Sequence, residues 1–139
     1  MLMNRLHVAP STRYSFLGLA LLVAGCAGST NVIGPENQLE VNNASDSFQW
    51  QATALSDITQ TLTYTWVTTG TVANVNQSST LGSGTADLRI VDAAGKQVYS
   101  RSLASNGTFQ TAAGAAGSWT VTVALSKANG TFNFRVQKP

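Results

Sequence analysis

The sequence predicts an all-β domain, an antiparallel β-sandwich of eight or nine strands, after a helical N-terminal signal peptide. Apolar and polar residues alternate with a period of two along most of the chain, and no stretch of twelve residues carries an apolar stripe at helical spacing. Asn-Gly and Asp-x-x-Gly sequences separate the alternating segments. One sheet of nine strands would leave its apolar face uncovered, so this pattern favours two sheets packed face to face.

The first 25 residues have the pattern of a bacterial signal peptide. Residues 1–15 contain Arg5, His7 and Arg13 and no acidic residue, and an apolar run follows over residues 16–25. That run is about half the ~20 apolar residues that a membrane-spanning helix needs. We therefore expect a targeting segment rather than a membrane anchor.

The end of this segment, Leu22-Val23-Ala24-Gly25-Cys26, resembles the lipobox of bacterial lipoproteins. The resemblance implies that the thiol of Cys26 takes a diacylglyceryl group through a thioether bond, that signal peptidase II cuts before this residue, and that the mature Cys26 carries two or three palmitate-like acyl chains in all. Two acyl chains suffice for stable membrane anchoring. Ala27 stands where an Asp retains Gram-negative lipoproteins in the inner membrane, so we expect the outer membrane if the source is Gram-negative. The alternative is an ordinary signal peptide with a cysteine at its cleavage site by chance.

The mature chain divides into a tether and one domain. Residues 26–37 hold the lipidated cysteine and a small, polar stretch with a Gly-Pro break, which is typical of a flexible tether. Residues 38–139 contain no proline before the last residue, and we expect them to form a single β-sandwich.

The first strands of the domain are predicted at 39–42, 47–55, 61–68 and 71–76. In the second, Phe48, Trp50 and Ala52 alternate with glutamine and serine. In the third, apolar residues including Tyr64 and Trp66 alternate with a threonine array at 59, 61, 63 and 65, which we interpret as a solvated face. Residues 56–60 could form at most one helical turn.

The later strands are predicted at 85–91, 96–103, 107–111, 118–126 and 130–137. Asp92-Ala93-Ala94-Gly95 is expected to be a hairpin loop, in which Asp92 accepts hydrogen bonds from the following backbone and Gly95 takes a left-handed conformation. Asn106-Gly107 and Asn129-Gly130 predict two type I′ hairpin turns. Trp119, like Trp50 and Trp66, falls in register with apolar neighbours, so we expect these side chains in the core.

The composition excludes several kinds of chemistry. From residue 26 onward there is no histidine, and six basic residues balance six acidic ones, which argues against nucleic-acid binding. Catalysis by a histidine base and histidine-ligated metals are excluded there. The carboxylates fall in turns, loops and polar strand positions. We expect a non-catalytic domain with no cofactor and no metal site.

Two aromatic residues are candidates for surface contact. Tyr99 alternates with Arg101 rather than with Val98, which predicts an exposed ring, and Trp66 lies near the end of its strand. The loops expected to add contacts are Asn42–Ser47, Ser56–Gln60 and Asn76–Gly84.

The stretch from Ala86 to Val136 is similar to the C-terminal half of small jelly-roll modules of the GOLD and pre-peptidase C-terminal types. The likeness rests on the Asp92-x-x-Gly95 strand end, the Gly107-Thr-Phe109 and Gly117-Ser-Trp119 strand starts and the closing segment at 129–136. Such modules bind proteins or carbohydrate and are not usually catalytic. The expected function is that of a lipid-anchored, non-catalytic envelope protein that binds a protein or has a structural role. The alternative is a membrane-anchored carbohydrate-binding module, which a plane of exposed aromatic rings would favour.

Overall fold

The computed structural model describes residues 31–139. They form one sheet of seven antiparallel strands. The strands are β1 (Glu40–Ala44), β2 (Ser47–Thr68), β3 (Asn74–Gln77), β4 (Thr80–Val91), β5 (Gln97–Ser102), β6 (Gly107–Gln110) and β7 (Gly117–Gln137), and a short 3₁₀ helix, η1 (Pro35–Asn37), precedes them. The all-β, antiparallel prediction is confirmed. The predicted signal peptide, Cys26 and the first part of the tether lie outside the described residues.

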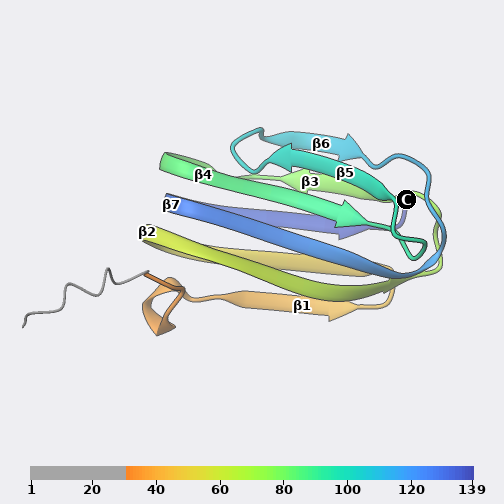
Figure 1. Cartoon of the computed structure of the whole chain (residues 1–139), viewed down its shortest axis with the longest axis horizontal. Helices are drawn as coiled ribbons and strands as arrows, with labels where there is room; N and C mark the ends of the chain where they lie inside the picture. The colour runs from red at the N-terminus through yellow and green to blue at the C-terminus, as the bar shows by residue number, and fades with distance from the viewer. Residues whose placement is uncertain (1–30) are drawn as a thin grey trace, which may run out of the picture.

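Two long strands, β2 and β7, organise the sheet. They pair antiparallel along nearly their whole lengths of 22 and 21 residues, and both turn back near the middle (Figure 1). The end of β7 pairs with β3, whereas its beginning pairs with β4. The strands thus form one sheet that folds over on itself rather than two separate sheets.

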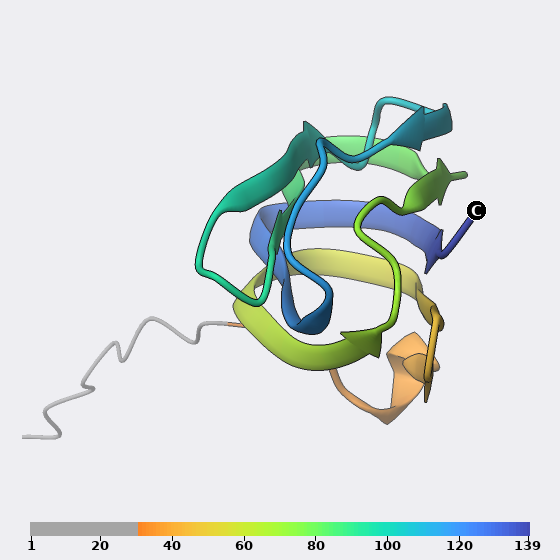
Figure 2. The same ribbon diagram turned by 90° about the vertical axis from the view of Figure 1, so that its right-hand side faces the viewer.

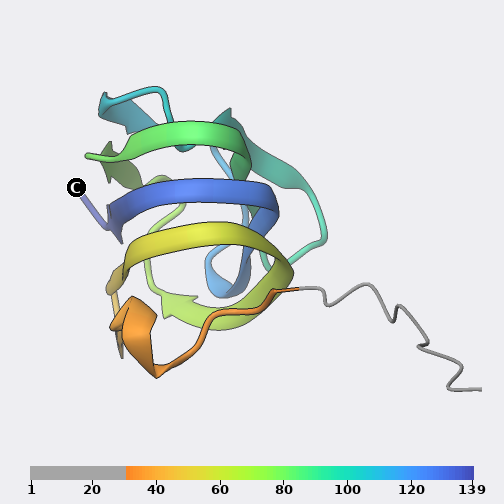
Figure 3. The ribbon, with the colours of Figure 1, turned by 90° about the vertical axis from the view of Figure 1, so that its left-hand side faces the viewer.

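We distinguish two halves of the sheet. The first half comprises β1, residues 47–52 of β2, residues 132–137 of β7, β3 and β6. The second half comprises residues 60–68 of β2, residues 117–126 of β7, residues 85–91 of β4, and β5. Viewed from the bend, the bent parts of β4, β7 and β2 lie one above another (Figure 3). The view from the opposite end shows how the ribbon curves back on itself (Figure 2).

The expected number of eight or nine strands is wrong, because a bend within a strand carries the same local sequence signals as a strand end. The segments predicted at 47–55 and 61–68 are both β2, and those predicted at 118–126 and 130–137 are both β7. The pairing of β2 with β7 shifts register three times between Ala52 and Gln60, which lets the strand bend without losing its partner.

Gly130 shows why a bend resembles a turn in sequence. Its φ is +142°, and a Cβ there would overlap the carbonyl oxygen of Thr80, so only glycine fits. The type I′ turn predicted at Asn129-Gly130 is therefore wrong, because the residue serves a bend inside a continuous strand.

The core lies between the two halves. Trp50, Trp66 and Trp119 are fully buried, as predicted for core residues. Trp66 and Trp119 face each other across β2 and β7 with ring centroids 5.7 Å apart in an edge-to-face arrangement. Trp50 in the first half donates a 3.0 Å hydrogen bond from Nε1 to the hydroxyl of Tyr64 in the second, which joins the two arms of β2.

The two remaining turn predictions have opposite outcomes. The loop from Asp92 to Gly95 joins the antiparallel pair β4 and β5, Oδ1 of Asp92 accepts from the backbone N–H groups of Ala94 and Lys96, and Gly95 has a φ of +85°, all as expected. Asn106-Gly107 is not a hairpin turn, because β5 and β6 do not pair. β5 belongs to the second half and β6 to the first, so the connection between them crosses from one half to the other.

Residues 31–37 contact β2. Asn31 forms a parallel bridge with Ile58, and the Asn37 side chain donates to the carbonyls of Thr53 and Ala54. The last part of the predicted tether is therefore held against β2.

Candidate functional site

The exposure expected of Tyr99 is wrong, and its physical reason is a β-bulge. Ile90 is opposite Tyr99 but Val91 is opposite Gln97, so Val98 is an extra residue in β5. Both Val98 and Tyr99 consequently point inward, with 5% and 7% of their surfaces exposed. The Tyr99 hydroxyl donates a 2.6 Å hydrogen bond to Oε1 of Gln77, and burial raises its pKa above the usual 10.0, with the charge of Arg101 partly opposing that rise.

Trp66 lies in the core, as its alternation predicts, and its position near the end of a predicted strand does not make it a surface contact. Its side chain is 0% exposed, and its Nε1 donates to the carbonyl of Ala44 at 3.1 Å, at the turn between β1 and β2. Much of the three predicted contact loops lies in strands β1, β2, β3 and β4. Candidate binding surfaces must therefore be sought on the faces and edges of the sheet.

The outer face of the first half carries a groove of about 450 Å³, which we call the amide groove. Gln49, Arg135, Asn76 and Thr108 stand directly opposite one another on β2, β7, β3 and β6, so they form one row across four strands. The remaining lining residues, from the neighbouring rows, are Asn74, Asn133 and Gln137.

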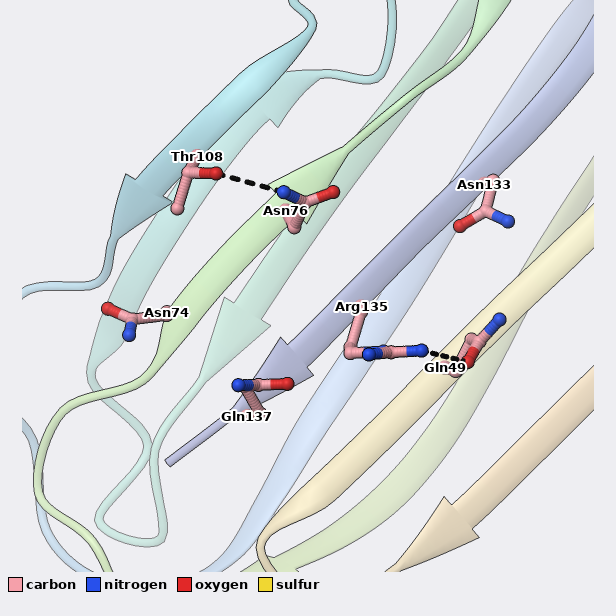
Figure 4. A pocket seen from close by; sticks show the side chains of 7 residues that line it. All are labelled: Gln49, Asn74, Asn76, Thr108, Asn133, Arg135 and Gln137. Atoms are coloured by element: carbon pink, nitrogen blue, oxygen red, sulfur yellow. Dashed lines mark hydrogen bonds between the residues drawn. The ribbon is translucent and has the colours of Figure 1, made fainter. Parts of the chain in front are cut away.

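Hydrogen bonds within the row leave its middle open (Figure 4). Nη2 of Arg135 donates to Oε1 of Gln49 at 3.0 Å, and Nδ2 of Asn76 donates to Oγ1 of Thr108 at 2.9 Å. Between these two pairs, Arg135 and Asn76 are register partners without a side-chain hydrogen bond to each other in the described part of the chain. The remaining guanidinium N–H groups and the Asn76 carbonyl oxygen are therefore available to a ligand.

The amide groove has one charged side chain. Its lining contains the guanidinium of Arg135, five amides and a hydroxyl, and no carboxylate. The acidic residue of the adjoining strand, Glu40, is opposite Gln51 and does not line the groove. The groove is thus a weakly cationic, hydrogen-bonding surface that lacks an acid–base pair.

A second surface is the free edge of β2 in the second half, residues 60–65, which we call the open edge. These residues pair with β7 on one side, and β1 reaches only as far as Gln51. The Thr59 N–H donates outward to the carbonyl of Asn31, and the Thr65 carbonyl accepts outward from Nδ2 of Asn43. Because alternate residues of an antiparallel strand share an orientation, the backbone groups of Thr61 and Thr63 also point away from β7.

The open edge differs from the edges that β1, β5 and β6 form. β1 carries Glu40, β5 carries Arg101 and follows Lys96, and β6 has only four residues. Charges and shortness are the usual protection of an edge against pairing with another strand. Residues 59–66 contain no charge, no proline and no glycine.

The outer face beside the open edge is the predicted threonine array. Thr59, Thr61, Thr63 and Thr65 are exposed, which confirms the expectation of a solvated face. On the inner side, Leu62 and Tyr64 are only partly buried, and Val41 on β1 remains 38% exposed. A strand that covered the open edge would meet hydroxyls on one side and apolar side chains on the other.

The carboxylates of Asp92 and Asp46 connect neighbouring segments of the chain through hydrogen bonds. Oδ2 of Asp92 accepts from the Ala115 N–H, and this and other backbone hydrogen bonds lower the pKa of Asp92 below its ordinary value of 3.8. Asp46, in the β1–β2 turn, accepts from the backbone N–H and hydroxyl of Thr69 and from the hydroxyl of Thr68. These bonds, with the backbone bond to Thr69 as the largest cause, lower the pKa of Asp46. Both carboxylates therefore stabilise the conformation of these loops.

Within residues 31–139 no group of three or more histidine, cysteine, aspartate or glutamate side chains could hold a metal ion. No helix in this part of the chain has the length and apolar character needed to cross a membrane.

Comparisons with protein family models, with curated proteins and with solved structures find no match to this chain. The functional interpretation therefore rests on the sequence and on the two surfaces described above.

Proposed function

We propose that the chain is a lipid-anchored, non-catalytic domain of a bacterial cell envelope that binds a protein partner by strand addition at the open edge. The observation that carries this proposal is the unprotected edge of residues 60–65, whose outward backbone groups are those that an added strand would pair with. The anchor is supported by the sequence Leu22–Cys26. The jelly-roll likeness fits a binding role and remains a hypothesis.

The chemistry of the edge specifies the kind of segment that would fit. Thr61 and Thr63 offer two outward N–H groups and two outward carbonyls over about 7 Å. The partly buried Leu62 and Tyr64 favour apolar side chains on the inner face of the added strand. We expect an extended segment with alternating apolar and polar residues, bound mainly through its backbone.

Photo-crosslinking in the native cell tests the edge directly. A photoreactive residue replaces Thr63 in one variant and Thr122 in another. Thr122 is the register partner of Thr63 on β7, so it lies on the same face but one strand farther from the edge. We expect a defined crosslinked protein from position 63 and none from position 122. Equal crosslinking from both positions would mean that the face, not the edge, makes the contact.

A proline substitution at residue 63 distinguishes a loss of strand addition from a loss of folding. Thr63→Pro removes the outward N–H but none of the N–H groups that bond β7, and edge strands tolerate proline at such positions. The variant should keep its thermal midpoint and lose the partner. Thr63→Val keeps the backbone N–H and should retain it. Retention of the partner by the proline variant would exclude strand addition.

The anchor has its own test. Cys26→Ala should release the protein from membranes and block cleavage before residue 26, as measured by membrane fractionation and intact mass. A wild-type mature mass without acyl chains would contradict the anchor and leave the edge proposal intact.

Carbohydrate binding by aromatic stacking has little support, because the aromatic rings of the described residues are buried or partly buried. A specific observation nevertheless favours a second, polar ligand: the amide groove.

A further inference from the structure

The amide groove combines two kinds of hydrogen-bonding group. Side-chain amides present a donor and an acceptor together, which suits a ligand rich in hydroxyls, since each hydroxyl both donates and accepts. Gln49, Asn76, Asn133 and Gln137 line the groove, and the hydrogen bonds between side chains do not consume both functions of any of them.

The guanidinium of Arg135 adds a preference for charge. It is the sole charged group of the lining, and its bond to Gln49 uses Nη2, which fixes its plane and leaves further N–H donors free. A fixed guanidinium fork matches a carboxylate, and such charge-assisted bonds are the strongest that a polar groove offers. Charge complementarity therefore favours an anionic ligand.

The shape of the groove favours an extended molecule. The row from Gln49 to Thr108 crosses four strands, which is roughly 14 Å. The lining contains no aromatic ring, so a nucleobase would find no stacking surface.

We infer that the amide groove binds a short acidic oligosaccharide, in which a carboxylate pairs with Arg135 and hydroxyls of the flanking sugars bond to the amides. This inference goes beyond the proposed function, because it concerns a different face of the domain and holds whether or not a strand adds at the open edge. Without ring stacking, the binding is expected to be weak and sensitive to salt.

The test is an NMR titration of the full chain, solubilised in a polyoxyethylene detergent so that no sugar headgroup competes. Three probes are compared: trigalacturonate, its neutral counterpart trigalactose, and the peptide Glu-Glu-Glu. The readout is the shift of assigned side-chain NH₂ signals of Gln49, Asn76, Asn133 and Gln137. We expect saturable shifts of these signals with trigalacturonate, at an affinity about tenfold or more above that for either other probe.

Two matched arginines provide the control. Arg89 on β4 also donates to a glutamine side chain, Gln97, at 2.8 Å, but it lies outside the amide groove. Arg135→Gln should weaken trigalacturonate binding about tenfold or more, whereas Arg89→Gln should leave it unchanged. Asn76→Asp, which places a carboxylate beside Arg135, should abolish it. Circular dichroism and thermal midpoints establish that each variant is folded.

Several results would overturn the inference. Equal binding of trigalactose would remove the role of charge, and equal binding of Glu-Glu-Glu would make the groove a site for acidic peptides. Shifts spread outside the groove, or loss of binding in both arginine variants alike, would mean nonspecific attraction.

Discussion

The two halves of the sheet use the same two strands but present different surfaces. The outer face of the first half carries long amides and Arg135 around a groove. The outer face of the second half carries short, β-branched threonines on β2 and β7, and it ends at the open edge. Behind both faces lies one continuous hydrophobic core. The difference shows that a period of two fixes which residues face out, while the residue types chosen for the outward positions determine what each face can bind.

The bend makes this division possible. Because β2 and β7 fold back together, Gln49 and Thr63 lie on different outer surfaces although both belong to β2. The inward-facing residues of the two arms of this strand pack into the same core. Substitutions can therefore separate what is common to the halves from what distinguishes them.

The largest effect is expected in the shared core. Trp119→Ala, in the second half, should lower the free energy of unfolding by about 3–5 kcal/mol, because it removes a fully buried ring packed against Trp66. Chemical denaturation followed by circular dichroism measures this, with Thr122→Ala on the outer face as the control, expected within about 0.5 kcal/mol. A cost below about 1 kcal/mol, or separate transitions for the two halves, would contradict a single core.

The bend should be the next most sensitive element. Gly130→Ala is expected to cost about 1–3 kcal/mol or more, because alanine must adopt a φ near +142° and its Cβ would meet the Thr80 carbonyl oxygen. Gly82→Ala is the matched control: it lies in the neighbouring part of β4, and its Cβ would approach no atom closer than 3.5 Å. Equal thermal midpoints for the two variants would argue against the bend.

Acidification should weaken the link that Asp46 makes between the halves. This residue of the β1–β2 turn binds Thr68 and Thr69 at the end of the second half, and its pKa is lowered in the folded state. A lowered folded pKa means that the unfolded chain binds the proton more tightly, so the stabilisation is present above the ordinary value of 3.8 and is lost as pH falls below it. Thermal midpoints measured between pH 6 and pH 2 should decline below about pH 4.

Asp46→Asn identifies the contribution of this carboxylate to the pH dependence. The decline should be shallower in the variant than in the wild type. Identical curves for the wild type and Asp46→Asn would exclude the role given to Asp46.

The smallest effect on folding is expected at the distinguishing surfaces. Arg135→Gln and Arg89→Gln should each change the free energy of unfolding by no more than about 0.5 kcal/mol, since both side chains are exposed. A much larger loss in the free energy of unfolding of either variant would mean that these polar side chains stabilise the fold and are not free for binding.

Local signals in the sequence predicted the class of the domain and most of its core. Alternation identified Trp50, Trp66 and Trp119 as core residues, and Asp92-x-x-Gly95 predicted its hairpin, because both signals act between near neighbours. Asn129-Gly130 failed because a bend and a turn require the same conformational freedom of glycine.

Other features depend on contacts between distant segments. Tyr99 is buried through a bulge that is defined only by the pairing of β5 with β4. The row formed by Gln49, Arg135, Asn76 and Thr108 requires the register of four strands that are far apart in the sequence. Alternation showed that Gln49 and Arg135 occupy polar positions, but not that they meet.

Hydrogen exchange along β2, measured residue by residue by NMR on the full chain, tests the open edge most directly. The N–H groups of Leu62 and Tyr64 point to β7, whereas those of Thr61 and Thr63 point outward. We predict strong protection at 62 and 64 and exchange roughly a hundredfold faster or more at 61 and 63. Equal protection at all four positions would show that the edge is already covered, and strand addition there would be contradicted.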